Sequence, residues 1–261
     1  MYEVAVPILM YHEVSPHPHS AFRRYTVTVR EFTRQMQWLA TFGYRTIDMD
    51  SLVRARMGHG SLPDRPVLIT FDDGFQGCVD HAAPVLGAYG FTATFYLVAG
   101  LIGEASRWIL PELGLELPLM NWDSARRLAS SGFQCGAHTL THPRLARLPR
   151  DRCRIELVDA RRRLEDGIGG PIHHLAYPFG DYDETVRALA AEAGYVSACS
   201  TREGLSGAAD DQLALHRVPV YGHDSLLDFA CRLRTGLTFR DSLRSRLDRV
   251  AARFHTSPKV G

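Results

Sequence analysis

Two adjacent carboxylates follow an apolar run in the first third of this chain. The run 66–71 ends directly before Asp72 and Asp73, and Gly74 comes next. Neighbouring carboxylates are costly to desolvate unless a positive group neutralises them, and a metal ion is the obvious neutraliser. The alternative is a solvated Asp-Asp-Gly turn, which is a common turn composition. The pair is therefore a candidate metal site that needs support from elsewhere in the chain.

A pair of histidines gives that support. His138 and His142 lie four residues apart, directly after the apolar run 133–137. At this spacing two imidazoles can share one face of a helical turn and offer neutral nitrogens to a divalent ion. Barrels and doubly wound sheets place their sites at the carboxyl ends of parallel strands, and both pairs follow predicted strands. We therefore predict that the carboxylates and the histidines meet in one site.

Strand-like and helix-like segments alternate along the chain and must position these residues. The predicted strands are 4–11, 44–49, 66–71, 92–98, 133–137, 173–177, 195–200 and 213–220. The predicted helices are 30–42, 50–57, 79–89, 123–131, 150–166, 183–193, 225–233 and 241–253. The alternation favours a parallel sheet covered by helices, and one α/β barrel of seven or eight strands fits better than an open sheet. Residues 101–120 show no clear period, and we expect a long loop near the site.

Charge and cysteine content exclude other classes of protein. Thirty basic residues stand against 29 acidic ones, a net charge of +1, which argues against a general nucleic-acid binder. The five cysteines are odd in number and contain no CxxC pair. We therefore expect free thiols in a reducing compartment, without a disulfide framework or a thiolate zinc site. Residues 1–10 have neither the pattern of a signal peptide nor the length of a membrane span.

Three motifs in sequence order resemble those of a known family. TFDDG at 70–74, HTLTH at 138–142 and YPFG at 177–180 are similar to the first three motifs of the polysaccharide deacetylases, the NodB-like carbohydrate esterases of family 4. The resemblance spans roughly residues 7–229. It implies a distorted (β/α) barrel of about seven strands, a divalent metal, most often zinc, and an amino-sugar polymer or oligosaccharide as substrate.

The same resemblance implies roles for individual residues. In the family the first aspartate of TFDDG is the general base, and the second joins the two histidines on the metal. Carried over, Asp72 is the base, and Asp73, His138 and His142 are the ligands. We expect Tyr177, Pro178 and Phe179 to contact the substrate, with the backbone N–H of Phe179 holding the oxyanion.

This chain departs from the family pattern at the third motif. The family has an arginine where this chain has Ala176, so the residue that normally orients the base is missing. Arg217 is the closest chemical replacement, because its position in an apolar strand demands a partner. The alternative is a salt bridge between Arg217 and some other carboxylate.

A second departure concerns the general acid, which the family takes from a late Leu-x-His motif. No well-spaced motif of this kind occurs near the C-terminus, since the spacing at His216 does not fit. Near the N-terminus, however, the apolar run 8–11 leads directly into His12. A closed barrel can take its last strand from either end of the chain. The sequence thus resembles the circularly permuted branch found among exopolysaccharide N-acetylglucosamine deacetylases, with His12 as the acid. The alternative for His12 is a bond to the backbone.

Together these features predict a metal-dependent N-deacetylase acting on an N-acetylglucosamine-type polysaccharide or glycan precursor. The divalent metal would hold the water and polarise the acetamide carbonyl. Three alternatives stay open: a small-molecule amide or cyclic imide hydrolase, an O-acetyl esterase, and a sugar-binding relative without activity. Trp108 and Tyr182, both in predicted loops, are expected to line a substrate groove.

We divide the chain into a barrel over residues 1–236 and a tail over 237–261. The helix predicted at 241–253 has one apolar stripe and several arginines elsewhere on its surface. It is expected to pack on the barrel, with peripheral contact to an acidic partner or a membrane surface as the alternative. We expect no transmembrane segment and a cytoplasmic location. Relatives that act outside the cytoplasm keep an extracytoplasmic location open.

Overall fold

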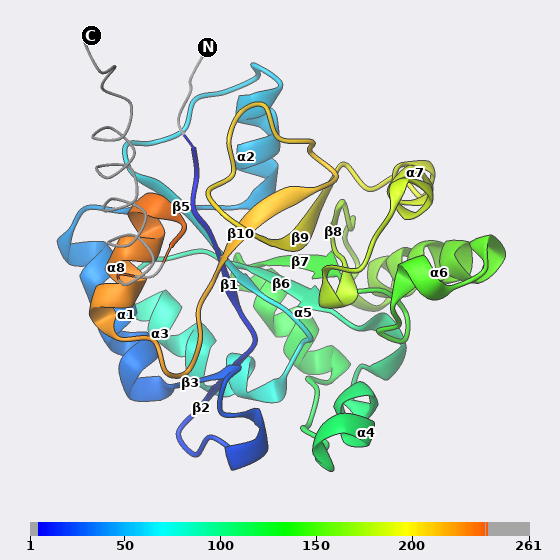
Figure 1. Cartoon of the computed structure of the whole chain (residues 1–261), viewed down its shortest axis with the longest axis horizontal. Helices are drawn as coiled ribbons and strands as arrows, with labels where there is room; N and C mark the ends of the chain where they lie inside the picture. Colours follow the sequence, from blue (N-terminus) through cyan, green and yellow to red (C-terminus); the bar gives the residue numbers. More distant parts are fainter. Residues whose placement is uncertain (1–4, 238, 240–261) are drawn as a thin grey trace, which may run out of the picture.

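Parallel strands form a closed ring at the centre of the molecule (Figure 1). The computed structural model describes residues 5–237 and 239. Its main sheet consists of β1 (Ile8–Tyr11), β4 (Arg45–Ile47), β5 (Pro66–Phe71), β6 (Thr94–Leu97), β7 (Gln134–Ala137), β8 (His174–Ala176), β9 (Ser197–Glu203) and β10 (Leu215–Pro219). All neighbouring strands run parallel, and β1 closes the ring by pairing with β10 on one edge and β5 on the other. The predicted barrel is confirmed.

The ring has seven strands, and β4 flanks it. Leu68 of β5 pairs with Ile8 of β1 and also with Ile47 of β4, so β1 and β4 lie on opposite edges of β5. On the edge of β5 away from β1, β4 pairs with residues 66–68 and β6 pairs with residues 70–71. β4 and β6 therefore share this edge, one after the other. Every residue of β1 and β5 is buried, as expected for parallel strands covered on both faces.

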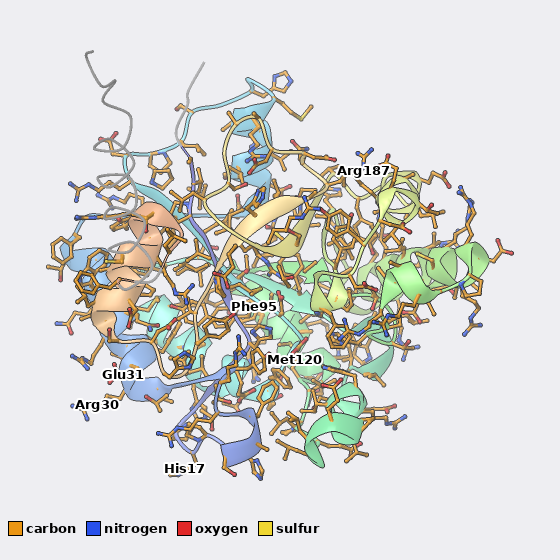
Figure 2. The ribbon with its side chains drawn as sticks, viewed as in Figure 1. His17, Arg30, Glu31, Phe95, Met120 and Arg187 are labelled. Atoms are coloured by element: carbon orange, nitrogen blue, oxygen red, sulfur yellow. The ribbon has the colours of Figure 1, made fainter. Side chains whose placement is uncertain are left out.

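The helices surround the strands (Figure 1). They are α1 (Val29–Thr41), α2 (Met49–Arg56), α3 (Ala83–Ala88), α4 (Leu110–Leu113), α5 (Trp122–Ser130), α6 (Arg150–Ile168), α7 (Glu184–Glu192) and α8 (Leu226–Thr235). In α1 the spacing of Phe32, Met36 and Leu39 places all three on one buried face. Figure 2 shows Arg30 and Glu31 of this helix at the edge of the molecule, whereas Phe95 of β6 lies near its centre.

The structure adds elements that the sequence did not predict. Directly after β1, β2 (Glu13–Ser15) and β3 (Thr26–Thr28) form a separate parallel pair. They have three residues each, which is too short for a periodic pattern. A π-helix over Cys78–Ala82 precedes α3, and the predicted loop 101–120 contains the 3-10 turn Arg107–Ile109 and α4. The predicted helix 241–253 lies outside the described residues.

The cysteines form no disulfide, and four of the five are buried. In the described part of the chain no helix combines the length and the apolar composition that spanning a bilayer requires.

β2 packs closely against Gly77, and a substitution at Gly77 tests this packing. A Cβ at this position would clash with Glu13 Oε1 and lie 2.6 Å from the carbonyl oxygen of Val14. We expect Gly77→Ala to lower the free energy of unfolding by about 1–3 kcal/mol, measured by urea denaturation, because β2 must shift. Gly87→Ala is the matched control, since a Cβ at Gly87 meets open space in α3. The control should be neutral or about 0.5–1 kcal/mol stabilising, and equal losses in both variants would contradict this packing.

Candidate active site

The carboxyl ends of the parallel strands bring the predicted residues to one end of the barrel. β5 leads into Asp72 and Asp73, β7 leads into His138, and β1 leads into His12. These segments are far apart in the sequence, and the closed ring of parallel strands is what places them together. The site is therefore assembled by the topology of the sheet.

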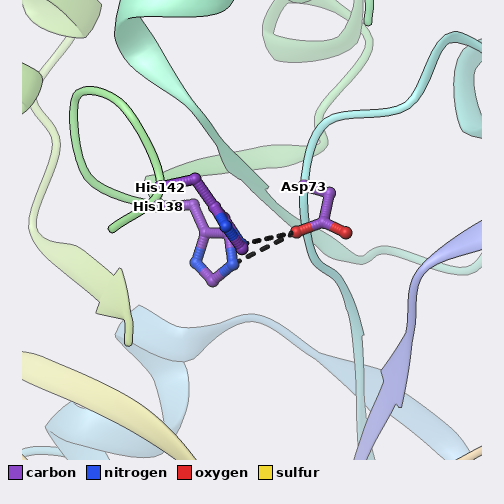
Figure 3. A group of neighbouring side chains, drawn as sticks. All are labelled: Asp73, His138 and His142. Atoms are coloured by element: carbon purple, nitrogen blue, oxygen red, sulfur yellow. Dashed lines mark ion pairs between the residues drawn. The ribbon is translucent and has the colours of Figure 1, made fainter. Parts of the chain in front are cut away.

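Asp73, His138 and His142 form a compact buried cluster (Figure 3). Asp73 Oδ1 lies 3.3 Å from His138 Nε2 and 3.2 Å from His142 Nε2. Each residue offers one ligand atom, and these three atoms all lie within 4.8 Å of one another. No other group of three potential ligands of this kind occurs within the described residues.

The histidine loop is fixed by hydrogen bonds from its own backbone. The backbone N–H groups of Leu140 and Thr141 both donate to Glu156 Oε2, at 2.9 and 2.8 Å, and the Thr141 hydroxyl donates to Glu156 Oε1. The N–H of His142 donates to the hydroxyl of Thr139 at 3.0 Å. Because Glu156 is buried on α6, it holds this loop against the barrel wall.

The tautomer of His138 follows from its partner. His138 Nδ1 lies 2.7 Å from the carbonyl oxygen of Ala176, and a carbonyl oxygen can only accept. Nδ1 must therefore carry a hydrogen, which leaves Nε2 of the neutral ring with a lone pair directed towards Asp73. A backbone carbonyl behind a histidine is the usual arrangement for a metal ligand. Ala176 thus contributes to the site through its backbone.

The cluster fits a divalent cation on its own geometry. In a tetrahedral zinc site, ligand atoms about 2.1 Å from the metal lie about 3.4 Å from one another. The measured separations between Asp73 Oδ1 and the two Nε2 atoms are close to this value. Burial lowers the pKa of His142 despite the nearby Asp73, so the ring is neutral at physiological pH. Two imidazoles and one carboxylate are a donor set that zinc accepts.

Backbone strain is concentrated at this site. Among the described residues, five other than glycine have a positive φ, and four of these are Asp73, Thr139, His142 and Phe179. Such conformations cost about 1–3 kcal/mol each and persist only where the surroundings enforce them. The hydrogen bonds of Glu156 and Thr139 supply that enforcement for the histidine loop. The strain marks these positions as built for a function.

Asp72 is held by Arg217 from β10. Arg217 donates from Nη1 to Asp72 Oδ1 at 2.7 Å and from Nη2 to Oδ2 at 2.6 Å. Its Nε donates to the carbonyl oxygen of Ser200, and Nη1 also reaches the hydroxyl of Thr70. Both partners of the ion pair are almost completely buried. Arg217 therefore lies where it can orient Asp72 in place of the arginine that is absent at Ala176.

The two aspartates are ionised for different reasons. Burial opposes ionisation of Asp72, but the charge and hydrogen bonds of Arg217 outweigh it and hold the pKa below its ordinary value. Burial also opposes ionisation of Asp73, but the adjacent His138 and His142 rings outweigh it and hold the pKa of that carboxyl well below its usual range. The two adjacent carboxylates thus have separate partners: Arg217 for Asp72 and the two histidine rings for Asp73.

His12 faces the aspartates from the end of β1. Burial lowers the pKa of His12, while the charges of Asp73 and Asp72 act in the opposite direction. Its ring packs against Tyr25 with centroids 5.1 Å apart, and the backbone carbonyl of His12 accepts a hydrogen bond from Cys78 Sγ. His12 therefore belongs to the same buried electrostatic environment as Asp72 and Asp73.

Aromatic side chains pack against His142. Trp108 stacks on His142 with centroids 4.2 Å apart, and Phe179 packs edge-on against the same ring at 4.7 Å. Tyr177 is buried. Its hydroxyl donates to the carbonyl oxygen of Leu213, and its ring stacks on Tyr182. Pro178 is buried beside them. Of the predicted groove residues, Trp108 contacts the candidate ligand His142 directly, whereas Tyr182 stacks on Tyr177.

Glu13 is a buried acid that sequence reasoning missed. It follows His12, is 8% exposed and packs against Gly77. Burial, with smaller contributions from Asp73 and Asp80, raises the pKa of Glu13 to about 8. Its place directly after His12 was the only available signal, because a three-residue strand shows no burial pattern. Glu13 is therefore a neutral acid beside the site at pH 7.

The Asp72–Arg217 pair predicts a pH-dependent stability defect. We expect Arg217→Met to lower the free energy of unfolding at pH 7 by about 3–5 kcal/mol, because Asp72 would keep a buried charge without a partner. As the pH falls towards 4, Asp72 of the variant can take up a proton, so the difference from wild type should narrow. Urea denaturation at both pH values measures this. The double variant Asp72→Asn, Arg217→Met is the control and should be less destabilised at pH 7 than Arg217→Met alone. A defect that does not depend on pH would contradict the pairing.

The raised pKa of Glu13 predicts that this residue destabilises the fold as the pH rises. At pH 4.5 and below, Glu13 keeps its proton in both states; above this pH the unfolded chain ionises first, so stability declines as the pH rises to 8. Glu13→Gln cannot ionise and should therefore gain stability over wild type between pH 5 and pH 8, on the order of 3 kcal/mol. Thermal or urea unfolding across this range tests it, with Glu116→Gln at an exposed position as control. A difference from wild type that stays constant with pH would count against a buried neutral acid.

Comparison with known proteins places this site in a family. Residues 59–198 match the family described as polysaccharide deacetylase. The Bacillus subtilis protein YxkH is 27% identical over 215 residues, which cover 82% of this chain and 71% of that protein. The poly-β-1,6-N-acetyl-D-glucosamine N-deacetylase of Escherichia coli K12 is 23% identical over 243 residues, which cover 80% of this chain but only 36% of that protein. Among solved structures, the Streptococcus pyogenes deacetylase PplD in complex with acetate superposes with a TM-score of 0.78 and 25% identity, over 89% of this chain and 100% of that one. The chain belongs to the polysaccharide deacetylase family.

Proposed function

We propose that this protein is a metal-dependent N-deacetylase that removes acetyl groups from an N-acetylglucosamine-type polysaccharide or glycan precursor. The observation that carries the proposal is the buried Asp73, His138 and His142 cluster directly beside Asp72, which Arg217 clamps. The name of the Escherichia coli relative supports this substrate class. The chain spans about a third of that relative, so the substrate of the whole relative supports the proposal without deciding it.

In this proposal Asp73, His138 and His142 hold one divalent cation, with zinc as the first candidate. When bound there, the cation would supply a Lewis acid that polarises the acetamide carbonyl and lowers the pKa of water. The protein's contribution is a dry, rigid ligand set: the carbonyl of Ala176 orients His138, and Trp108 and Phe179 enclose His142.

Asp72 is proposed as the general base. Its carboxylate takes a proton from the attacking water as the water oxygen bonds to the acetamide carbon. Because Arg217 binds both carboxylate oxygens, the base is fixed in one orientation. The same pairing keeps Asp72 ionised at any physiological pH, since its pKa lies below the ordinary value.

His12 is proposed as the general acid. In its protonated form, which the charges of Asp73 and Asp72 favour, His12 gives a proton to the amide nitrogen as the carbon–nitrogen bond breaks, and this releases acetate and a free amine. The backbone N–H of Phe179 is proposed to stabilise the oxyanion, with Tyr177 and Pro178 shaping the turn that presents it. The left-handed backbone of Phe179, with φ of 58°, holds this turn beside His142. We also propose a cytoplasmic location, which the free cysteines support.

Acetate release from N-acetylglucosamine oligomers tests the function. The protein is treated with a chelator, dialysed and assayed before and after zinc is added. We expect loss of activity on chelation and recovery with zinc. A protein that hydrolyses cyclic imides or O-acetyl esters but never the acetamide would support an alternative chemistry of the same fold. Binding of the oligomers without hydrolysis would support a sugar-binding role.

The ligand assignment predicts which histidines matter for metal. We expect His138→Ala to lose most of the bound zinc, because a three-ligand site rarely holds zinc after losing one ligand. Metal content by atomic emission after dialysis measures this. His173→Ala is the control, because the His173 side chain is 41% exposed and lies next to Asp50, away from the cluster. Stoichiometric zinc in His138→Ala would overturn the assignment.

The role of His12 predicts a substrate-dependent defect. His12→Ala should lose about 10²–10⁴-fold in kcat on an N-acetyl substrate, because the amine leaving group needs a proton. An activated acetate ester, whose leaving group needs little protonation, should be much less affected. His216→Ala is the matched control, since His216 is bonded to Asp210 at 3.0 Å in a separate ion pair. Equal losses on both substrates, or a selective loss in His216→Ala, would contradict the assignment.

A further inference from the structure

One arginine lies beside the candidate metal ligands without an acidic partner. Arg144 follows His142 by two residues, and its guanidinium carbon lies 4.1 Å from the centroid of the Phe179 ring. That ring packs against His142, so a single aromatic ring separates the guanidinium from a candidate ligand. Within the described part of the chain, no carboxylate oxygen lies within 4.0 Å of an Arg144 nitrogen. The proposed mechanism makes no use of this charge.

The ring beneath Arg144 is rigid and open to solvent. Phe179 is 40% exposed, and its left-handed backbone sits in the short turn Pro178–Gly180. A guanidinium stacked on a ring keeps its N–H donors at the edge of the stack. Arg144 is itself half-buried, so the contact limits where its donors can point. The guanidinium thus lies against the ring that contacts His142, and within the described residues no acidic side chain pairs with it.

Two acids that contact the backbone around Arg144 are committed to those contacts. Glu156 accepts the backbone N–H groups of the histidine loop, and Asp181 accepts the N–H of Ala146 at 3.2 Å. By contrast, Arg150 and Arg154 at the start of α6 both pair with Glu192, at 3.2 and 2.9 Å. Within the described residues Arg144 forms no ion pair beside the site, whereas Arg150 and Arg154 on the neighbouring helix are both paired.

We propose that Arg144 is a specificity-determining residue that binds an anionic substituent, a carboxylate or a phosphate, on the amino-sugar substrate. The inference rests on the proposed function, since it concerns the substrate of that same site. A guanidinium can donate two parallel hydrogen bonds to either group, and such charge-assisted bonds are the stronger class. Because the stack on Phe179 already restricts the side chain, little rotamer freedom is lost on binding. A neutral glycan would leave this charge unpaired.

Equilibrium binding to the zinc-loaded protein tests the proposal. Three ligands of equal length are compared by calorimetry: a neutral N-acetylglucosamine oligomer, an oligomer alternating with glucuronic acid, and an oligomer carrying 6-phosphate. We expect wild type to bind at least one anionic ligand about tenfold or more tighter than the neutral one. Arg144→Gln should remove that preference, and Arg144→Lys should keep part of it. The two anionic arms show whether a carboxylate or a phosphate is preferred.

Arg147→Gln is the matched control. Arg147 is an exposed arginine three residues further along, and within the described residues no aromatic ring lies under it. This variant should keep the preference of wild type. Equal affinity of wild type for neutral and anionic ligands would overturn the proposal. An equal loss of affinity for neutral and anionic ligands in Arg144→Gln would also overturn it, because the residue would then have a structural role. Acetate release by the same proteins is scored separately: a binding preference without hydrolysis would refute the proposed function and leave this inference standing.

Discussion

Asp72 and Asp73 are adjacent, and each is less than 5% exposed, so neither could stay ionised without a positive partner of its own. Arg217 of β10 neutralises the first through two hydrogen bonds. The second faces two imidazoles in a donor set that suits a divalent cation. Since β1 lies between β10 and β5, the pairing of Arg217 with Asp72 spans the strand that closes the barrel. The closed ring therefore positions the Arg217–Asp72 pair, and the pair in turn links the strands on either side of β1.

The arrangement separates two tasks that neighbouring carboxylates would otherwise share. The left-handed backbone of Asp73, with φ of 75°, allows its side chain to face the histidines while that of Asp72 faces Arg217. Glu156 fixes the histidine loop from outside the barrel, and the carbonyl of Ala176 fixes the tautomer of His138 from within. These supports enforce the strained backbone at the ligands. Aromatic rings then exclude water from one side of the cluster.

Sequence reasoning recovered the parts of this account that depend on strand ends. The strand 66–71 was predicted with its observed bounds, because six consecutive apolar or β-branched residues precede the aspartates. Arg217 was named as the replacement for the missing arginine because its apolar strand demands a partner, but the choice between Asp72 and another carboxylate stayed open. Arg217 lies 145 residues from Asp72, and only the closed ring brings them together. β2 and β3 were missed because three-residue strands carry no period. Glu13 was missed because it lies in one of these short strands. Its burial also depends on contact with Gly77, which lies 64 positions along the chain.

The central claim is that the two aspartates have different partners: Asp73 binds a cation with the histidines, and Asp72 stays on Arg217. A crystal structure of the zinc-loaded protein, with anomalous data at the zinc edge, tests this most directly. The account predicts one zinc ion coordinated by Asp73, His138 Nε2 and His142 Nε2, with both hydrogen bonds between Arg217 and Asp72 intact. Zinc coordinated by Asp72, or zinc bound away from these histidines, would contradict it.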